Sequence, residues 1–254
     1  AQKIKTAFND KFYDKSNMTY KSQEKNTIAL AFGLAPEQDE IAVAQALKRD
    51  VTETHNGHIF TGYIGSRYIH SVLAEYGYDK TLNDMLHKES FPGYGYLFSR
   101  GANTFWENWG ELKFEDREQH GDARSKNHPY QAGFTAWFYN GIAGINPDPQ
   151  NPGFKHIILR PQYINTMEWA SAKYNSIYGP IISDWENTAD EFIWTVSIPV
   201  NTTATVYIPG NDKDSVYEGD KLISQSDNIR FLKIEDGNSI FHLESGNYSF
   251  KMLK

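Results

Sequence analysis

The segment from Gly93 to Gly110 gathers residue types that can hold a flat ligand and move a proton. It reads GYGYLFSRGANTFWENWG, and Glu107 is its single carboxylate, set between Trp106 and Trp109. Flat aromatic faces can stack on sugar rings or nucleobases, and a carboxylate beside apolar surface can have its pKa tuned for proton transfer. The segment has neither helical nor strand periodicity, so we predict a loop. The alternative interpretation is an aromatic loop packed on the core, in which Glu107 caps a helix.

His128 is the second residue whose type and position suggest chemistry. It directly precedes Pro129, a residue typical of the first position of a helix. The helix dipole disfavours an imidazolium there, so we expect a neutral, hydrogen-bonding side chain. Alternatively, His128 only enters the helix and bonds a nearby carbonyl. His55 and His58 could suggest a metal pair, but no third suitable ligand lies nearby and the chain has no cysteine, so we predict neither a metal nor another cofactor.

Several classes of function lose their basis in the sequence. No glycine-rich phosphate loop follows a strand and no G-x-S-x-G motif occurs, which argues against phosphoryl transfer and serine hydrolysis. The formal net charge of −7 argues against a nucleic-acid partner, and no apolar run is long enough for a membrane span. The absence of cysteine leaves the cellular compartment open. The acidic side chains of the polar stretch after Gly110, which we interpret as a solvated loop, are Glu115, Asp116, Glu118 and Asp122.

The residues before position 146 are predicted to form helices. Apolar side chains recur at helical spacing, Ser22 can cap the second helix, and Pro36 can open the third. Short connections imply antiparallel neighbours, so we predict stacked helix hairpins. The predicted helical ranges are 3–13, 22–33, 36–51, 63–76, 81–87 and 129–143.

The composition changes at residues 146–153, where three prolines and a glycine mark a boundary. Alternating apolar and polar residues then predict roughly eight strands, as in an antiparallel β-sandwich. Asp236-Gly237-Asn238 and Ser245-Gly246-Asn247 are hairpin signals between the last three strands. The predicted fold class is therefore α+β, with a helical domain over residues 1–149 and a sandwich over residues 150–254.

A carboxylate among aromatic residues on a helical scaffold fits glycoside hydrolysis. That reaction uses two carboxyl groups flanking the scissile bond, one as general acid and the other as base or nucleophile. Glu107 is the one strong candidate that the sequence offers.

A series of motifs in this order resembles the bacterial α-L-rhamnosidases of glycoside hydrolase family 78. Each motif is weak by itself, and their order and spacing make the resemblance specific over about residues 1–161. The motifs are HIFTGYIGSRY at 58–68, YGY at 94–96, GANTFWE at 101–107, NHP at 127–129, WFY at 137–139, AGI at 143–145 and PGFK at 152–155.

The resemblance implies an inverting, metal-free glycosidase that removes terminal α-L-rhamnose from an oligosaccharide, polysaccharide or other glycoside. It implies that the helical domain is the second half of a catalytic (α/α)6 barrel. Glu107 matches the family's general base, and His128 matches a histidine of the sugar subsite, while Trp106 and Trp109 are expected to shape the surroundings of Glu107. The family's general acid lies earlier in the barrel, and no segment here matches it. The stretch from Tyr130 to Thr135 departs from the small residues usual at that place.

Other functions compatible with the residues are another (α/α)6 glycosidase, such as an uronyl hydrolase or a trehalase-like enzyme, a carbohydrate-binding module without catalysis, and a structural scaffold. The chain starts without a helix cap or a leader, and the resemblance would place its start in mid-barrel. We therefore expect a piece of a longer polypeptide whose N-terminal part is its partner, and we expect residues 1–254 alone to be inactive and prone to association through an exposed apolar face.

Overall fold

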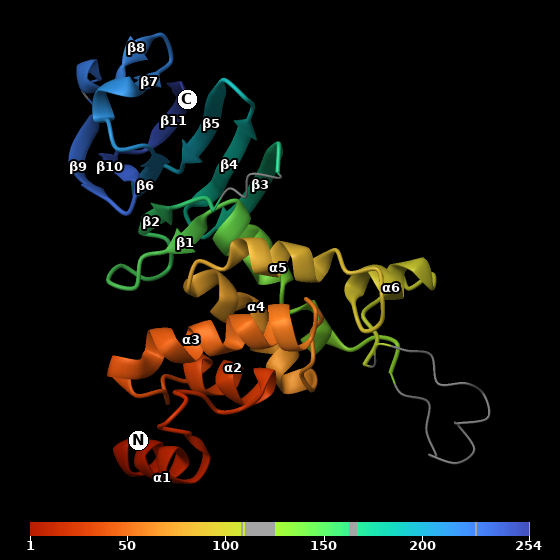
Figure 1. Ribbon diagram of the computed structural model, residues 1–254. Coiled ribbons are helices and arrows are strands. Elements are labelled where there is room, and N and C mark those ends of the chain that lie inside the picture. The colour runs from red at the N-terminus through yellow and green to blue at the C-terminus, as the bar shows by residue number, and fades with distance from the viewer. Residues whose placement is uncertain (108, 110–124, 163–166, 227, 254) are drawn as a thin grey trace. The chain divides into compact units, whose positions relative to one another are not determined.

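The computed structural model describes residues 1–107, 109, 125–162, 167–226 and 228–253. They form two compact units, Ala1–Trp137 and Phe138–Lys254, each of which is described by itself (Figure 1). The acidic stretch with Glu115, Asp116, Glu118 and Asp122 lies outside the described residues. The domain limits of 1–149 and 150–254 stay a prediction.

The first unit is helical, as predicted (Figure 1). Ser22 caps the second helix, where its hydroxyl accepts a hydrogen bond from the Lys25 amide at 3.3 Å. A 3₁₀ turn, η1 (Glu37–Asp39), leads from Pro36 into the third helix. The main helices in the described part of the unit are α1 (Gln2–Phe12), α2 (Gln23–Ala31), α3 (Glu40–Arg49), α4 (Tyr63–Glu75), α5 (Asp79–Leu86) and α6 (Tyr94–Ser99). Among the described residues, no helix is long and apolar enough to cross a bilayer.

The core of the helical unit lies where α2 packs against α3 and α4. Its fully buried apolar side chains include Ala29, Val43, Leu47, Ile69 and Leu73. Burial of this apolar surface is the main stabilising contribution.

The start of α2 buries polar side chains. Asn26 accepts a hydrogen bond from the Tyr20 amide at 2.7 Å. The Gln23 carboxamide donates to the His58 carbonyl at 3.1 Å and accepts from the Phe60 amide at 2.8 Å. These bonds tie two loops to the beginning of α2.

Two helix predictions are wrong, and close backbone packing explains both. Residues 94–99 form α6 where we predicted a loop. A Cβ on Gly95 would lie 2.7 Å from the Lys88 carbonyl oxygen, so this glycine permits a close approach of two chain segments. The predicted helix over 129–143 is divided into a 3₁₀ turn, η3 (Pro129–Ala132), a short helix, α8 (Thr135–Trp137), and a π-helical turn, η4 (Phe138–Ile142).

Gly133 marks the break between η3 and α8. A Cβ at this position would lie 2.5 Å from the Arg67 carbonyl oxygen of α4. The chain therefore leaves regular helical geometry where it rests on the backbone of α4.

The second unit is a β-sandwich of two sheets (Figure 1). The five-stranded sheet has the order β1-β2-β6-β10-β9, and the six-stranded sheet has the order β3-β4-β5-β11-β7-β8. The pair β2–β6 is parallel and the other pairs are antiparallel. The strands are β1 (Ile145–Pro147), β2 (His156–Leu159), β3 (Trp169–Ser176), β4 (Gly179–Asn187), β5 (Glu191–Ile198), β6 (Thr203–Pro209), β7 (Val216–Glu218), β8 (Lys221–Leu222), β9 (Ile229–Glu235), β10 (Asn238–Leu243) and β11 (Gly246–Leu253).

One of the two predicted hairpins is confirmed. Asp236 and Gly237 both have positive φ, +49° and +75°, and join β9 to β10 in the tight turn that this dipeptide favours. The second prediction is wrong, because β10 and β11 belong to different sheets. The chain crosses the sandwich at Ser245, so that a turn-forming sequence connects two layers.

The interior of the sandwich is filled by alternate side chains of both sheets. Trp194, Val206, Phe241 and Phe250 are essentially inaccessible to solvent. Ser183 provides a small polar centre, because its hydroxyl accepts from the Trp194 indole at 2.9 Å and donates to the Ala143 carbonyl at 2.7 Å.

Candidate active site

Glu107 and His128 lie on two chain segments that pair side by side, residues 104–107 and 125–128. The His128 amide donates to the Phe105 carbonyl at 2.7 Å, and the Glu107 amide donates to the Ser125 carbonyl at 2.8 Å. The Thr104 hydroxyl adds a hydrogen bond to the Lys126 carbonyl. The structure thus brings together the two residues that the sequence singled out, although they lie far apart along the chain.

The Glu107 carboxylate is oriented by the same pairing. Its Oε2 atom accepts a hydrogen bond from the Ser125 amide at 3.1 Å, and the side chain is half-buried. Ser125 belongs to no helix, so this bond is not a helix cap. A carboxylate held by a backbone amide has a defined direction, which a proton-transfer group requires.

The two tryptophans beside Glu107 have different surroundings. Trp106 is 7% exposed, and the Lys126 ammonium lies 4.5 Å from its ring centroid. Trp109 is half-buried and packs edge-on against Tyr94, with ring centroids 4.8 Å apart. Trp106 is therefore part of the packing under the loop, whereas Trp109 retains some exposed surface.

His128 sits in a small aromatic cluster. Its ring centroid lies 5.4 Å from that of Tyr63, the first residue of α4, and 5.6 Å from that of Tyr130 in η3. Its Nδ1 atom is buried and has no hydrogen-bond partner within the described part of the chain. Buried ring nitrogens are normally hydrogen-bonded, so an unpartnered Nδ1 is unusual.

Gln131 is a site residue that our sequence analysis did not select. It is 2% exposed, and its Nε2 atom donates to the Glu107 carbonyl at 3.3 Å. The backbone carbonyl of Gln131 accepts a hydrogen bond from the Tyr94 hydroxyl at 2.9 Å. The one signal in the sequence was the unusual stretch from Tyr130 to Thr135, of which Gln131 is a part.

A buried histidine, His70, lies next to Tyr94. His70 is fully buried in α4, and its Nε2 atom is 3.4 Å from the Tyr94 hydroxyl. Burial lowers the pKa of His70 to about 3, against the opposing effect of its hydrogen bond to the Ser66 carbonyl. The ring is therefore neutral, and its Nδ1 donates to Ser66.

His55 and His58 face different partners. His55 Nε2 is 3.1 Å from Asp50 Oδ1, and its ring stacks on Phe60 at 4.3 Å. His58 bonds the Pro92 carbonyl through Nδ1 at 2.8 Å. Within the described ranges, no group of three or more His, Cys, Asp or Glu side chains is arranged to hold a metal ion.

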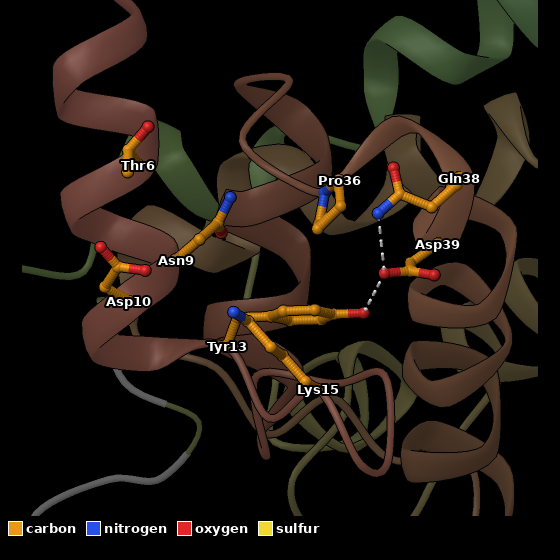
Figure 2. A pocket seen from close by; sticks show the side chains of 8 residues that line it. All are labelled: Thr6, Asn9, Asp10, Tyr13, Lys15, Pro36, Gln38 and Asp39. Atoms are coloured by element: carbon orange, nitrogen blue, oxygen red, sulfur yellow. Dashed lines mark hydrogen bonds between the residues drawn. The ribbon is translucent and has the colours of Figure 1, made fainter.

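A separate pocket of about 410 Å³ lies between α1 and η1 (Figure 2). Figure 2 shows the Tyr13 hydroxyl pointing at Asp39, and this hydrogen bond measures 2.8 Å. Gln38 contacts the same carboxylate oxygen at 3.4 Å. Burial and the hydrogen bond to Asp39 raise the pKa of Tyr13 above its ordinary value. The central polar groups thus satisfy one another, and none of the predicted site residues lines this pocket.

Both units match family models of known proteins. Residues 1–142 match the bacterial alpha-L-rhamnosidase 6 hairpin glycosidase domain, and residues 144–222 match the bacterial alpha-L-rhamnosidase C-terminal domain. The chain belongs to the bacterial α-L-rhamnosidase family. The predicted family and the predicted fold class, a helical hairpin region followed by an antiparallel β-sheet domain, are confirmed.

Individual relatives agree with this assignment. An α-L-rhamnosidase of Streptomyces avermitilis is 30% identical over 229 residues, which are 90% of this chain and 21% of that protein. One from Formosa agariphila is 30% identical over 250 residues, which are 96% of this chain and 26% of that protein.

Two solved structures are similar over nearly the whole chain. The α-L-rhamnosidase from Dictyoglumus thermophilum has a TM-score of 0.86 and 32% identity, and the match covers 100% of this chain and 28% of that one. The Streptomyces avermitilis α-L-rhamnosidase complexed with L-rhamnose has a TM-score of 0.85 and 27% identity, with 99% and 23% covered. The present chain thus spans about a quarter of the length of the α-L-rhamnosidases that it resembles.

Proposed function

We propose that this chain contributes one side of the active site of an inverting α-L-rhamnosidase, and that Glu107 is the general base. The observation that carries the proposal is the carboxylate of Glu107, held by the Ser125 amide at 3.1 Å on the segment paired with that of His128. Membership of the bacterial α-L-rhamnosidase family supports the substrate, a terminal non-reducing α-L-rhamnoside.

The base acts on a water molecule. In an inverting glycosidase, the two carboxyl groups are roughly 6.5–9.5 Å apart, which leaves room for a water between the base and the anomeric carbon. Ser125 holds Oε2 of Glu107, and we assign Oε1 to the water. As the water attacks, its proton passes to Glu107, while a general acid on the opposite face protonates the departing oxygen.

His128 is proposed to bind the sugar. The residue is half-buried, its segment is paired with that of Glu107, and a sugar hydroxyl can both donate and accept a hydrogen bond. Trp109 and Trp106 would shape the surroundings of Glu107, the first through exposed surface and the second by packing beneath the loop.

The general acid and the rest of the sugar site would come from additional polypeptide. The support is the coverage of the relatives, of which this chain matches between 21% and 28%. The partners proposed are therefore that additional polypeptide and a rhamnose-containing glycoside, oligosaccharide or polysaccharide. The solved Streptomyces avermitilis relative is complexed with L-rhamnose, which supports this choice of sugar.

The test is the substitution Glu107→Gln in the full-length polypeptide. We expect kcat for an aryl α-L-rhamnoside to fall by about 10³-fold, because a positioned general base typically contributes 10²–10⁴-fold. Binding of L-rhamnose, followed by calorimetry, should stay within about threefold, since glutamine keeps the size and hydrogen-bonding capacity of the side chain.

The control is Glu37→Gln, which changes an exposed carboxylate of η1 and should leave kcat unaltered. Near-normal hydrolysis by the Glu107→Gln enzyme would disprove the base assignment. Proton NMR of the first product tests the stereochemistry separately: β-L-rhamnose is expected, and initial release of the α-anomer would contradict inversion.

A further inference from the structure

A chain of buried polar groups supports the main chain of Glu107. The Tyr94 hydroxyl of α6 donates to the Gln131 backbone carbonyl of η3 at 2.9 Å, and the neutral His70 ring of α4 packs beside it with Nε2 3.4 Å from the hydroxyl. The Gln131 carboxamide then reaches the Glu107 carbonyl at 3.3 Å. His70, Tyr94 and Gln131 are each no more than 2% exposed.

Gln131 connects this chain to both proposed site residues. Its side chain bonds Glu107, and its backbone lies three residues after His128 in the same short turn. The turn itself is fixed, because Gly133 rests directly on the backbone of Arg67. A shift of Gln131 would therefore alter the position of Glu107 relative to His128.

The Gln131 side chain buries a polar atom at a cost in folding stability. Its Oε1 atom is buried and has no hydrogen-bond partner within the described part of the chain. A buried polar atom without a partner destabilises the folded state, and an apolar side chain of the same size would avoid this cost. Among the described residues, Thr27 and Asn187 also bury an unpartnered oxygen, so what distinguishes Gln131 is its hydrogen bond to the Glu107 carbonyl.

The Glu107 main chain needs restraint on two sides. Its amide is held by the Ser125 carbonyl at 2.8 Å, and its carbonyl is held by Gln131. Together these bonds restrict rotation of the peptide units that carry the side chain. Because the carboxylate must meet a water in line with the anomeric carbon, a small displacement has a large effect on rate.

We propose that Gln131 is a positioning residue, which fixes the Glu107 carboxylate relative to His128 through its hydrogen bond to the Glu107 carbonyl. The inference rests on the proposed role of Glu107 and adds a residue that the family resemblance did not identify.

The test uses Gln131→Met in the full-length polypeptide, which keeps the length of the side chain and removes the donor. We expect kcat to fall by about 10- to 100-fold with KM within about threefold, because misplacement of a catalytic group by 1 Å can cost 10²-fold. In the Glu107→Gln background, the same substitution should lower kcat by less than about twofold, because the group it positions is then inactive.

Two further variants keep the test decisive. Thr27→Val is the matched control, because Thr27 is also buried in the helical unit and its hydroxyl has no partner among the described residues. The kcat of this variant should not change. Tyr94→Phe keeps the ring and removes the bond to the Gln131 carbonyl, so a smaller loss, about 2- to 10-fold in kcat, is expected. It replaces Gln131→Met in the cycle with Glu107→Gln if the methionine variant does not fold.

The outcomes separate the two proposals. An unchanged kcat in Gln131→Met, or an equal loss in the presence and absence of the Glu107 carboxylate, would overturn the positioning role while leaving Glu107 as the base. Normal activity of Glu107→Gln alone would overturn both.

Discussion

The helical unit and the sandwich treat buried polar groups differently. In the sandwich, Ser183 satisfies the Trp194 indole and the Ala143 carbonyl at once, and apolar residues fill most of the interior. The helical unit buries more polar side chains among its described residues: Gln23, Asn26, Thr27, Ser66, His70, Thr81 and Gln131. Near Glu107, two of the buried polar atoms, His128 Nδ1 and Gln131 Oε1, have no partner in the described structure.

Because of this difference, substitutions in the two units should have different effects. A satisfied polar centre, as in the sandwich, stabilises one packing arrangement. Unsatisfied buried atoms destabilise the fold. Within the described residues, two of them lie beside Glu107, and Thr27 and Asn187 carry others away from it. We therefore expect substitutions in the sandwich to change stability at constant kcat, and substitutions around Glu107 to change kcat.

The largest effect on stability is expected for Trp194→Ala. Trp194 is fully buried between Phe192 and Phe250, so its truncation should lower the free energy of unfolding by about 3–5 kcal/mol. Urea denaturation followed by circular dichroism measures the loss. The kcat of the fraction that remains folded should be normal. A fall in kcat would show that the interior of the sandwich affects catalysis as well as stability.

A smaller effect is expected for Ser183→Ala. The substitution leaves the Trp194 indole and the Ala143 carbonyl without their shared partner, at a cost of about 1–3 kcal/mol. The same denaturation experiment applies, with Ser171→Ala on the exposed face of β3 as the control. Equal stabilities of the two variants would show that the Ser183 hydroxyl is not needed in the core.

The smallest effect is a pH dependence in the helical unit. The pKa of His70 is about 3 in the folded protein and near 6.5 in the unfolded chain. At a pH between these values, the unfolded chain binds a proton at His70 and the folded protein does not. Stability should therefore fall as the pH drops below about 6.5, and His70 should contribute about 1 kcal/mol of this loss between pH 7 and 5.5.

His70→Phe isolates this contribution, because the other titrating groups are common to both proteins. The variant should lose less stability than the parent over the same pH range in parallel urea titrations. Identical pH profiles would mean that His70 is not buried in its neutral form.

The elements that sequence analysis predicted correctly carry strong local signals. Ser22 and an apolar run define α2, and alternation defines β5 and β6. The family could be predicted because its motifs occur in order along the chain. The two-residue turn at Asp236-Gly237 is likewise local, since both residues tolerate positive φ.

The errors arise where distant segments decide the structure. α6 contains three aromatic residues and a glycine in six positions, and its helical form depends on packing against Lys88. Gln131 is separated from Glu107 by more than twenty residues, and a single glutamine in a helix-like pattern has no periodicity that shows its burial. Ser245-Gly246 has the composition of a hairpin turn, yet the sheet to which each strand belongs is set by the whole sandwich.

Residues 104–107 pair with residues 125–128. This pairing can hold the Glu107 carboxylate in place whatever the length of chain that joins the two segments. The hydrogen bonds to Ser125, Lys126 and His128 lie at the base of that connection, and an insertion beyond them would leave them in place. Closing a longer connection costs little, since each doubling in length adds about 0.6 kcal/mol. Evolution or engineering could thus lengthen this stretch without losing the hydrogen bonds that hold the Glu107 carboxylate.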